Sequence, residues 1–359
     1  MKRLFCLLCL WLFLSPRASA TLTIKATFDA SVTTQTNAAD IENAISTAIQ
    51  TFEDLYTNNA TINITFYWGP TGPFTSGIGL GRSQFTLTGS SYSQITNALF
   101  THRASAADTS SLASLPSSDP IGGPWLVCYA NAKVLGLRSA TDPATDGSIG
   151  FSTNVTYTFD PNNRIVAGQY DLIGVAEHEI SEVLGRATFR LTNDFLPYDL
   201  FRFTNGADRS FDPTATNAYF SVDDGATALR FFYTNASLGD IQDWKSTANP
   251  DAFDAFLPAG HLLPFSAVDI LTLDVIGYNG PGLPPAPRLA GTRMANGDFV
   301  LKFVNTPGTG FTVLTTTNLA LPRTNWTVLG SAIENPPGLY QFTNSPPASI
   351  ERFYDVRSP

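Results

Sequence analysis

The sequence predicts an α+β protein built of two parts, a mixed domain over residues 21–280 and a small all-β sandwich domain over residues 289–359. Helix-like and strand-like apolar patterns alternate through the first part, which is typical of a mixed fold. A segment rich in proline and glycine, residues 281–288, then interrupts the chain and predicts a linker. The short runs of alternating polar and apolar residues that follow it predict strands only.

Residues 1–20 have the composition of a signal peptide. Lys2 and Arg3 are followed by an apolar run and by an Ala-Ser-Ala sequence that ends at Ala20, an order that is typical of a secretory signal. We therefore expect a secreted, extracellular protein. No later segment reaches the roughly 18 uninterrupted apolar residues that a membrane span needs. Removal of the signal would leave Cys128 as the one cysteine, without a disulfide partner.

The charge of the chain argues against two classes of partner. Its 30 acidic residues outnumber its 21 basic residues, which gives a formal net charge of −9 at pH 7. Nucleic acids and anionic membrane surfaces repel a protein of this charge. We expect a monomer that binds neither.

The first elements are predicted by a change of apolar period. Residues 22–29 (LTIKATFD) alternate in the manner of a strand. Apolar residues then recur at helical spacing and predict an amphipathic helix over residues 38–56, with Asn37 as its N-cap. Residues 60–69 (ATINITFYWG) return to the strand pattern, so the chain opens with a β-α-β unit.

The middle of the chain predicts further elements around a long polar region, residues 70–120. A helix is expected near residues 91–99 within it, and an apolar segment follows at residues 124–137. Residues 146–153 (DGSIGFST) have strand character, and we expect them to form an antiparallel edge strand that lines a cleft. Residues 265–279 predict a closing helix with one apolar face.

The stretch GVAEHEISEVLGR, residues 174–186, carries the candidate chemistry. Positions four apart lie on one face of a helix, so His178 and Glu182 can chelate one metal ion. Glu179 is rotated by about 100° from His178, which suits a general base that takes a proton from metal-activated water. Carboxylate oxygen is an acceptable zinc ligand. We expect Zn²⁺, with Mn²⁺ or Fe²⁺ as alternatives because carboxylates also suit harder ions.

Other interpretations of the same stretch stand beside this one. Glu182 precedes Arg186 by four residues, an arrangement that also describes an ordinary ion pair on a helix surface. The chain would then be a non-catalytic exported binding or adhesion protein. A glycosidase that uses two carboxylates is a third class, but Glu179 and Glu182 lie too close on one helix to bracket a sugar.

Segments of the first part, in their order, resemble a family of secreted bacterial metzincin-like (zincin) metalloproteases: ANAKVLGL, DGSIGFS, AEHEISEVLGR, PYDLFRF and FSAVDILTLDVIGYN. The resemblance covers about residues 22–280. It implies a catalytic domain made of a twisted sheet plus helices, and a metal-dependent hydrolase of proteins or peptides that acts through Glu179. Members carry either a two-histidine helix or the H-E-x-x-E variant. The C-terminal runs resemble a small immunoglobulin-like module.

The third metal ligand is the open question. The position at which metzincins place it is Thr188, and threonine is a poor ligand. Asp199, in the segment PYDLFRF, is the first candidate because other zincins take an acidic ligand at a similar distance downstream. His261, which precedes the closing helix, is the alternative, and His102 and Asp194 follow it. Asp199 would otherwise cap a turn or pair with a nearby arginine.

Overall fold

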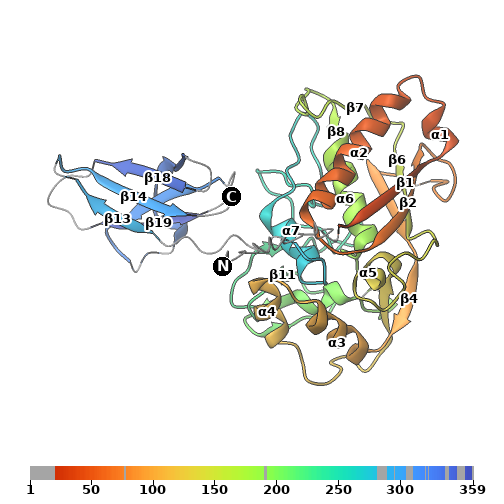
Figure 1. The fold of residues 1–359 in the computed structure, drawn as a ribbon, viewed down its shortest axis with the longest axis horizontal. Helices are drawn as coiled ribbons and strands as arrows, with labels where there is room; N and C mark the ends of the chain where they lie inside the picture. The colour runs from red at the N-terminus through yellow and green to blue at the C-terminus, as the bar shows by residue number, and fades with distance from the viewer. Residues whose placement is uncertain are drawn as a thin grey trace, which may run out of the picture.

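A computed structural model of the chain describes residues 21–76, 78–189, 192–280, 289–294, 296–304, 310–319, 321, 323–335, 339–345 and 352–357. The expected signal peptide, residues 1–20, and the expected linker, residues 281–288, lie outside these ranges. The described fold is mixed α+β with several small sheets (Figure 1), which confirms the predicted class at that level. No described helix combines the length and the apolar character that crossing a membrane requires.

The main sheet has the strand order β1-β2-β6-β3. Its strands are β1 (Thr23–Phe28), β2 (Thr61–Trp68), β6 (Gly147–Phe151) and β3 (Gly81–Phe85). The first three are parallel, and β3 runs antiparallel to β6. The expectation that residues 146–153 form the edge strand is therefore wrong, because β6 is paired on both sides and β3 forms the edge.

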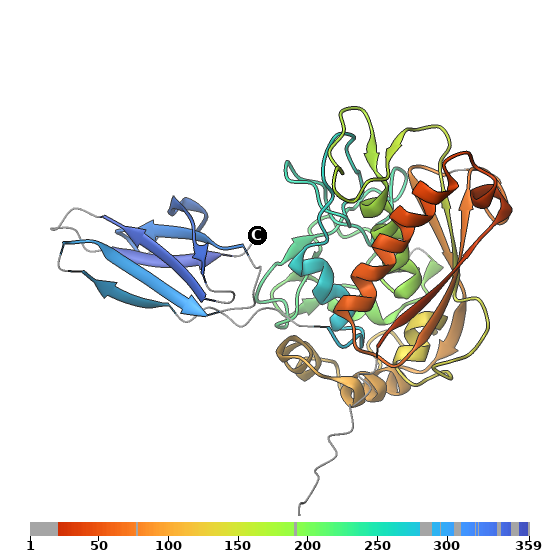
Figure 2. The ribbon, with the colours of Figure 1, turned by 45° about the horizontal axis from the view of Figure 1, so that its top comes forward.

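Two helices pack against this sheet. The helix α2 (Ala38–Leu55) buries the apolar stripe that its sequence predicts, although Asn37 makes no side-chain cap hydrogen bond. Together with the short α1 (Ala30–Thr33), it connects β1 to the parallel strand β2. The second helix, α6 (Leu172–Leu184), packs against α2 and against β3 and β6 (Figure 2). It carries the candidate site into the centre of the molecule.

Shorter elements surround this centre. They are β4 (Leu87–Ser90), α3 (Tyr92–His102), α4 (Ala106–Ala113), β5 (Trp125–Cys128), α5 (Tyr129–Val134), β7 (Tyr157–Thr158), β8 (Tyr170–Asp171) and α7 (Ala267–Asp274). The polar region 70–120 thus holds two strands and two helices. The segment 124–137 divides into β5 and α5, and the closing helix is shorter than the pattern over residues 265–279 predicts.

A second small sheet follows α6 in the chain. The 3-10 helix η2 (Pro197–Phe201) leads into strands with the order β10-β9-β11-β12. These strands are β9 (Arg202–Asn205), β10 (Asp208–Arg209), β11 (Tyr219–Phe220) and β12 (Arg230–Phe231). Aromatic side chains of this sheet and of Trp244 pack into the same apolar core as α2 and α6. This packing holds the loop that contains Trp244 close to α6.

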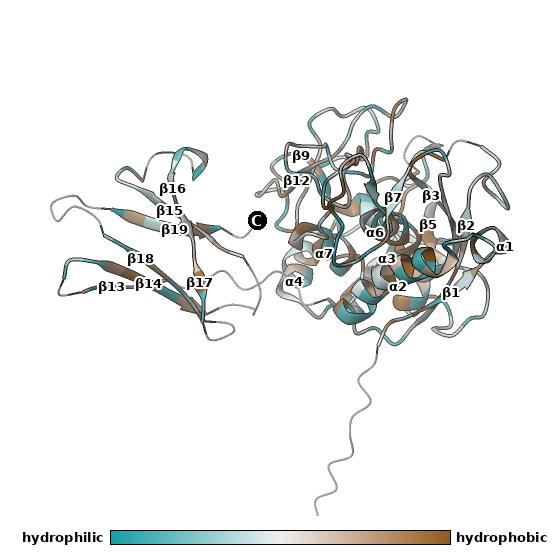
Figure 3. Ribbon diagram, turned by 90° about the horizontal axis from the view of Figure 1, so that it is seen from above, coloured by the Kyte–Doolittle hydropathy of each residue, from teal (hydrophilic) through white to brown (hydrophobic). Residues whose placement is uncertain are grey.

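The C-terminal strands form two further sheets, with the orders β13-β14-β18-β17 and β16-β15-β19 (Figure 3). The elements are β13 (Ala290–Arg293), β14 (Phe299–Val304), β15 (Thr312–Thr316), η3 (Arg323–Asn325), β16 (Thr327–Ser331), β17 (Ile333–Glu334), β18 (Leu339–Asn344) and β19 (Phe353–Arg357). Leu301 and Tyr340 of one sheet share an apolar cluster with Val313 and Val356 of the other. The two sheets therefore bury their facing sides together.

The buried carboxyl group of Asp274, at the end of α7, makes stability depend on pH. Ser105 donates a hydrogen bond to it, but burial, followed by the charge of Asp108, raises the pKa of Asp274 to about 7. An unfolded aspartate titrates near pH 3.9. Since the folded chain holds this proton more tightly, the free energy of unfolding falls as the pH rises from about 4 through about 7.

We predict that Asp274→Asn removes this loss of unfolding free energy at high pH. Asparagine keeps an oxygen that can accept the hydrogen bond from Ser105 but cannot ionise. The variant should unfold at a higher temperature than the wild type at pH 8 and at nearly the same temperature at pH 4, as measured by calorimetry. An equal difference at both pH values would contradict this account.

Candidate metal centre

The helix α6 fixes the first two candidate ligands. Every residue from Leu172 to Leu184 is buried, because the helix packs against both the sheet and α2. His178 and Glu182 lie one turn apart on the same face. The helix ends at Gly185, whose φ of 123° is a conformation that residues with a Cβ rarely adopt. The turn at Gly185 therefore sets where Arg186 leaves the helix.

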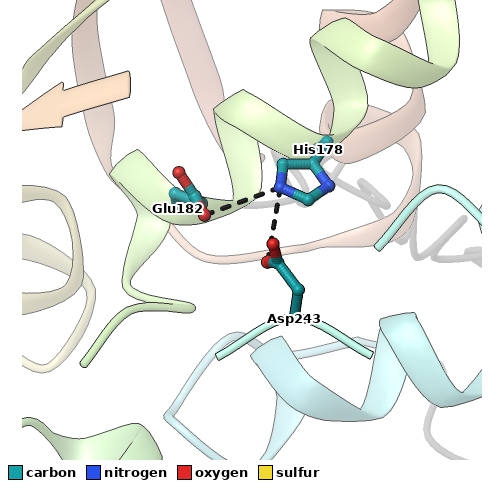
Figure 4. Close-up of side chains that lie close together, drawn as sticks. All are labelled: His178, Glu182 and Asp243. Carbon is teal, nitrogen blue, oxygen red and sulfur yellow. Dashed lines mark ion pairs between the residues drawn. The ribbon is translucent and has the colours of Figure 1, made fainter. Parts of the chain in front are cut away.

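A third candidate ligand, the carboxylate of Asp243, joins this face from a distant loop (Figure 4). His178 Nε2 lies 3.6 Å from Glu182 Oε1 and 3.4 Å from Asp243 Oδ1. One ligand atom from each residue lies within 4.8 Å of the others. Ligand atoms at tetrahedral positions around zinc are separated by roughly 3.3 Å, given bond lengths of about 2.0–2.1 Å. The two separations from His178 Nε2 are close to this value, so the group is compatible with a tetrahedral ion held by the three residues.

Neighbouring groups orient these ligand atoms. His178 Nδ1 lies 2.8 Å from the carbonyl oxygen of Ala252, which leaves Nε2 to face the carboxylates. Ser83 donates a hydrogen bond of 2.7 Å to Glu182 Oε2, and Gln242 donates one of 2.8 Å to Oε1. Such outer partners fix the tautomer and the direction of metal ligands. The arrangement is thus that of a supported ligand set.

Arg186 is the buried counter-charge of this group. Its side chain is fully buried, donates a 2.6 Å hydrogen bond to Asp243 Oδ1 and lies 3.5 Å from Glu182 Oε1. It also donates to Ser181 Oγ, and its guanidinium carbon lies 4.2 Å from the centre of the Phe253 ring. The alternative of an ordinary surface ion pair between Glu182 and Arg186 is therefore wrong, because both side chains are buried.

The charges of the three candidate ligands strongly affect one another's pKa values. Burial alone would lower the pKa of His178, but the charges of Asp243 and Glu182 outweigh it and raise that pKa to about 10. Burial would raise the pKa of Glu182, but the hydrogen bond and charge of His178, together with Arg186, lower it to about 2. Without a metal, His178 is therefore protonated beside Glu182 and Asp243. A bound divalent ion would take the place of its proton.

Glu179 lies beside this group and lines a cleft of about 370 Å³ together with His178 and Asp243. Burial, followed by the charge of Glu182, raises the pKa of Glu179 well above its ordinary range. A divalent cation nearby would favour the ionised form again. A carboxyl group in this position can accept and return a proton at the mouth of the metal centre.

The edge strand β3 approaches Glu179 closely at Gly81. A Cβ atom on Gly81 would lie 2.5 Å from Glu179 Oε1 and 2.6 Å from its Cγ. Strand and helix can only approach this closely because Gly81 has no side chain. The side chain of Glu179 is thereby held between β3 and the metal centre.

We predict that Gly81→Ala displaces the Glu179 carboxyl group. Any hydrolysis that depends on Glu179 should then fall by about 100-fold, the effect of a misplacement of about 1 Å. Zinc affinity should stay close to that of the wild type, because Glu179 is not a ligand. Gly79→Ala is the matched control, since a Cβ at Gly79 meets nothing within 4 Å in the same cleft. Wild-type turnover in Gly81→Ala would contradict this prediction.

The structure places Asp199 outside the group that could hold a metal ion. Thr188 donates a hydrogen bond to its Oδ1, and the backbone of Leu196 donates to its Oδ2 at the start of η2. Asp199 thus caps a turn, the alternative that its sequence allows. The third position in the described group is taken by Asp243 instead. His261, the other candidate, is exposed in a loop.

The remaining sequence candidates also lie elsewhere. Asp194 accepts a hydrogen bond from Thr192, and His102 ends α3. Asp243 has no periodic signal around it, because it lies in an irregular segment. Its position depends on the adjacent Trp244, which is fully buried and bonded through its backbone to Phe253. An acidic residue beside an aromatic core residue is the one local trace of this role in the sequence.

Comparisons of the chain with protein-family models, with curated proteins and with solved structures find no match. The function of the site is therefore argued from its geometry and from the residues that form it.

Proposed function

We propose that the chain is a metal-dependent peptidase in which His178, Glu182 and Asp243 hold one divalent ion and Glu179 is the general base. The observation that carries the proposal is the spacing of the ligand atoms. Separations of 3.4 and 3.6 Å from His178 Nε2 suit one ion of zinc size. The motif H-E-x-x-E supplies the first two ligands and the base, as the resemblance to metzincin-like proteases implies.

The ligand set supports zinc, with manganese and iron as alternatives. One imidazole and two carboxylates are acceptable to all three ions. The two carboxylates neutralise the charge of a divalent ion, which makes it a weaker Lewis acid than it would be with two imidazoles. The positive charge of Arg186, 2.6 Å from Asp243, draws electron density from that ligand and offsets part of this loss.

Different residues of the chain have different roles in the proposed hydrolysis. A divalent ion held by His178, Glu182 and Asp243 would polarise the substrate carbonyl and make a water molecule more acidic. Glu179, at the cleft, would take a proton from the water as its oxygen bonds to the carbonyl carbon, and would deliver that proton to the amine nitrogen as the C–N bond breaks. Gln242 and Ser83 each donate a hydrogen bond to Glu182 and so hold its carboxylate in place.

Other parts of the chain complete the proposal. We infer that residues 1–20 direct export and that residues 289–359 form an accessory β-sandwich domain, which the shared apolar cluster of the two C-terminal sheets supports. A glycosidase is less well supported than a peptidase, because both oxygens of Glu182 accept hydrogen bonds from the protein. A protein that binds metal but catalyses nothing is the second candidate, since the same three ligands would serve it.

Metal removal tests the proposal. The purified chain should hydrolyse casein, lose that activity when a chelator strips the ion, and regain it with about one equivalent of Zn²⁺. Activity that survives in metal-free protein would contradict the peptidase. A chain that binds one zinc ion but hydrolyses no member of a broad peptide library would establish the binding protein instead.

A further inference from the structure

The cleft beside the metal centre is acidic beyond what the metal requires. Four carboxyl side chains line it: Glu179, Asp240, Asp243 and Asp254. Among the described residues that line the cleft, His178 is the one basic side chain, and there is no lysine or arginine. The proposed chemistry uses Asp243 as a ligand and Glu179 as a base. Asp240 and Asp254 have no task in it.

Asp254 is buried and incompletely bonded. It is 1% exposed, and its Oδ2 accepts a hydrogen bond from the backbone of Asp251. Its Oδ1 makes no hydrogen bond of ordinary geometry, although the backbone of Thr247 is close enough to lower the pKa of Asp254. The nearby arginine, Arg230, is paired with Asp251 instead. Burial, followed by the charge of Asp251, raises the pKa of Asp254 to about 7. Asp254 lines the cleft, so a ligand whose binding turns this carboxyl group toward the cleft can satisfy that oxygen.

Asp240 provides a second acceptor at the same cleft. It is exposed, and its carboxyl group has no hydrogen bond or ion pair in the described part of the chain. Apolar side chains stand beside both residues: Leu238 is 68% exposed and Phe256 is 49% exposed. Exposed apolar groups next to carboxylates suit a long side chain with an apolar stem and a cationic end.

We propose that this cleft binds peptides through a lysine or arginine side chain, whose cationic end is held by Asp240 and Asp254. The apolar stem of that side chain packs against Leu238 and Phe256. The electrostatic potential in a cleft lined by negative charges attracts a cationic side chain and repels acidic peptides. This inference rests on the proposed function, because it names the substrate class of the same site.

The test uses three labelled peptides of one sequence that differ at one central position, which is lysine, norleucine or glutamate. Fluorescence anisotropy measures their binding to the full chain with the substitution Glu179→Gln, so that no peptide is consumed. We expect the lysine peptide to bind about tenfold more tightly than the norleucine peptide, and the glutamate peptide to bind least, as expected for a charged pair at a partly desolvated site.

Two variants test which residues cause the preference for the lysine peptide. Asp240→Asn and Asp254→Asn, added singly, should each reduce the ratio of lysine to norleucine affinity by several-fold. Asp208→Asn, which removes a charge from the exposed strand β10, is the matched control and should leave the ratio unchanged. Asp240 is exposed, so its variant remains informative even where a change at Asp254 impairs folding.

The outcomes separate this inference from the proposed function. Equal binding of the three peptides, or a preference that survives in Asp240→Asn, would overturn the subsite. Because the binding ratio is measured without turnover, it is obtained whether or not the wild-type chain hydrolyses peptides. Hydrolysis of a broad library by wild-type protein without any basic preference would leave the peptidase standing and reject the subsite.

Discussion

Replacing Asp243 with asparagine is expected to lower zinc affinity by more than about 100-fold, since loss of an outer-shell partner alone costs about 10–100-fold. Asparagine has nearly the same shape as aspartate but brings a neutral oxygen, which is a weak zinc ligand. It can still accept a hydrogen bond from Arg186, so the buried guanidinium keeps a partner. Competition with a fluorescent zinc chelator measures the affinity.

The control for this change is Asp199→Asn. Asp199 is the ligand that the sequence favours, but its carboxylate caps η2 through hydrogen bonds from Thr188 and Leu196. Zinc affinity in Asp199→Asn should therefore stay within a few-fold of wild type. The reverse pattern, with zinc lost in Asp199→Asn and kept in Asp243→Asn, would show that a ligand set based on Asp243 is wrong.

Replacing Glu179 with glutamine is expected to lower peptide hydrolysis by about 10²–10⁴-fold, the usual contribution of a general base. Glutamine keeps the size of the side chain between β3 and α6 but cannot take a proton. Zinc affinity should not fall, because Glu179 is outside the ligand set. Steady-state kinetics and metal titration on the same preparation measure both quantities.

The matched control is Glu177→Gln, the same substitution on the same helix. Glu177 faces away from the cleft, accepts a hydrogen bond from Thr51 and lies 3.6 Å from Arg164. Turnover in that variant should stay close to wild type. Full hydrolysis by Glu179→Gln would mean that another group moves the proton, and it would remove Glu179 from the proposed mechanism.

The elements with a strong apolar period were predicted well. The helix over residues 38–56 is α2 within one residue at its C-terminal end, and β1 and β2 lie where alternation placed them. In β2 the buried Ile62, Ile64 and Phe66 alternate with less buried residues. An element that buries one face has apolar residues at a regular spacing, and this spacing can be recognised in the sequence alone.

Strand β6 is an element whose position in the sheet does not follow from its local sequence pattern. Its strand character is evident in the sequence, but the predicted position, an antiparallel edge strand that lines a cleft, is wrong. The structure buries it between two strands. Cβ atoms on Gly147 and Gly150 would lie 2.7 Å from Val183 and 2.6 Å from Phe74. The glycines allow close packing there, a reason that depends on neighbours far along the chain.

The candidate site divides in the same way. His178, Glu179 and Glu182 were predictable because one helix sets their mutual geometry. Asp243 was not, because it reaches the site through a tertiary contact. The burial of Trp244 against Phe220 and Phe232 positions it, and the 2.6 Å hydrogen bond from Arg186 orients it. The period of apolar residues in the sequence does not indicate either contact.

The central claim is that one ion is held by His178, Glu182 and Asp243. Anomalous X-ray diffraction at the zinc absorption edge, from crystals of the full chain grown with zinc, tests it directly. The account predicts one strong peak at about 2.0–2.2 Å from His178 Nε2 and from an oxygen of each carboxylate. A peak at Asp199 or His261, or no peak near α6 at saturating zinc, would contradict it.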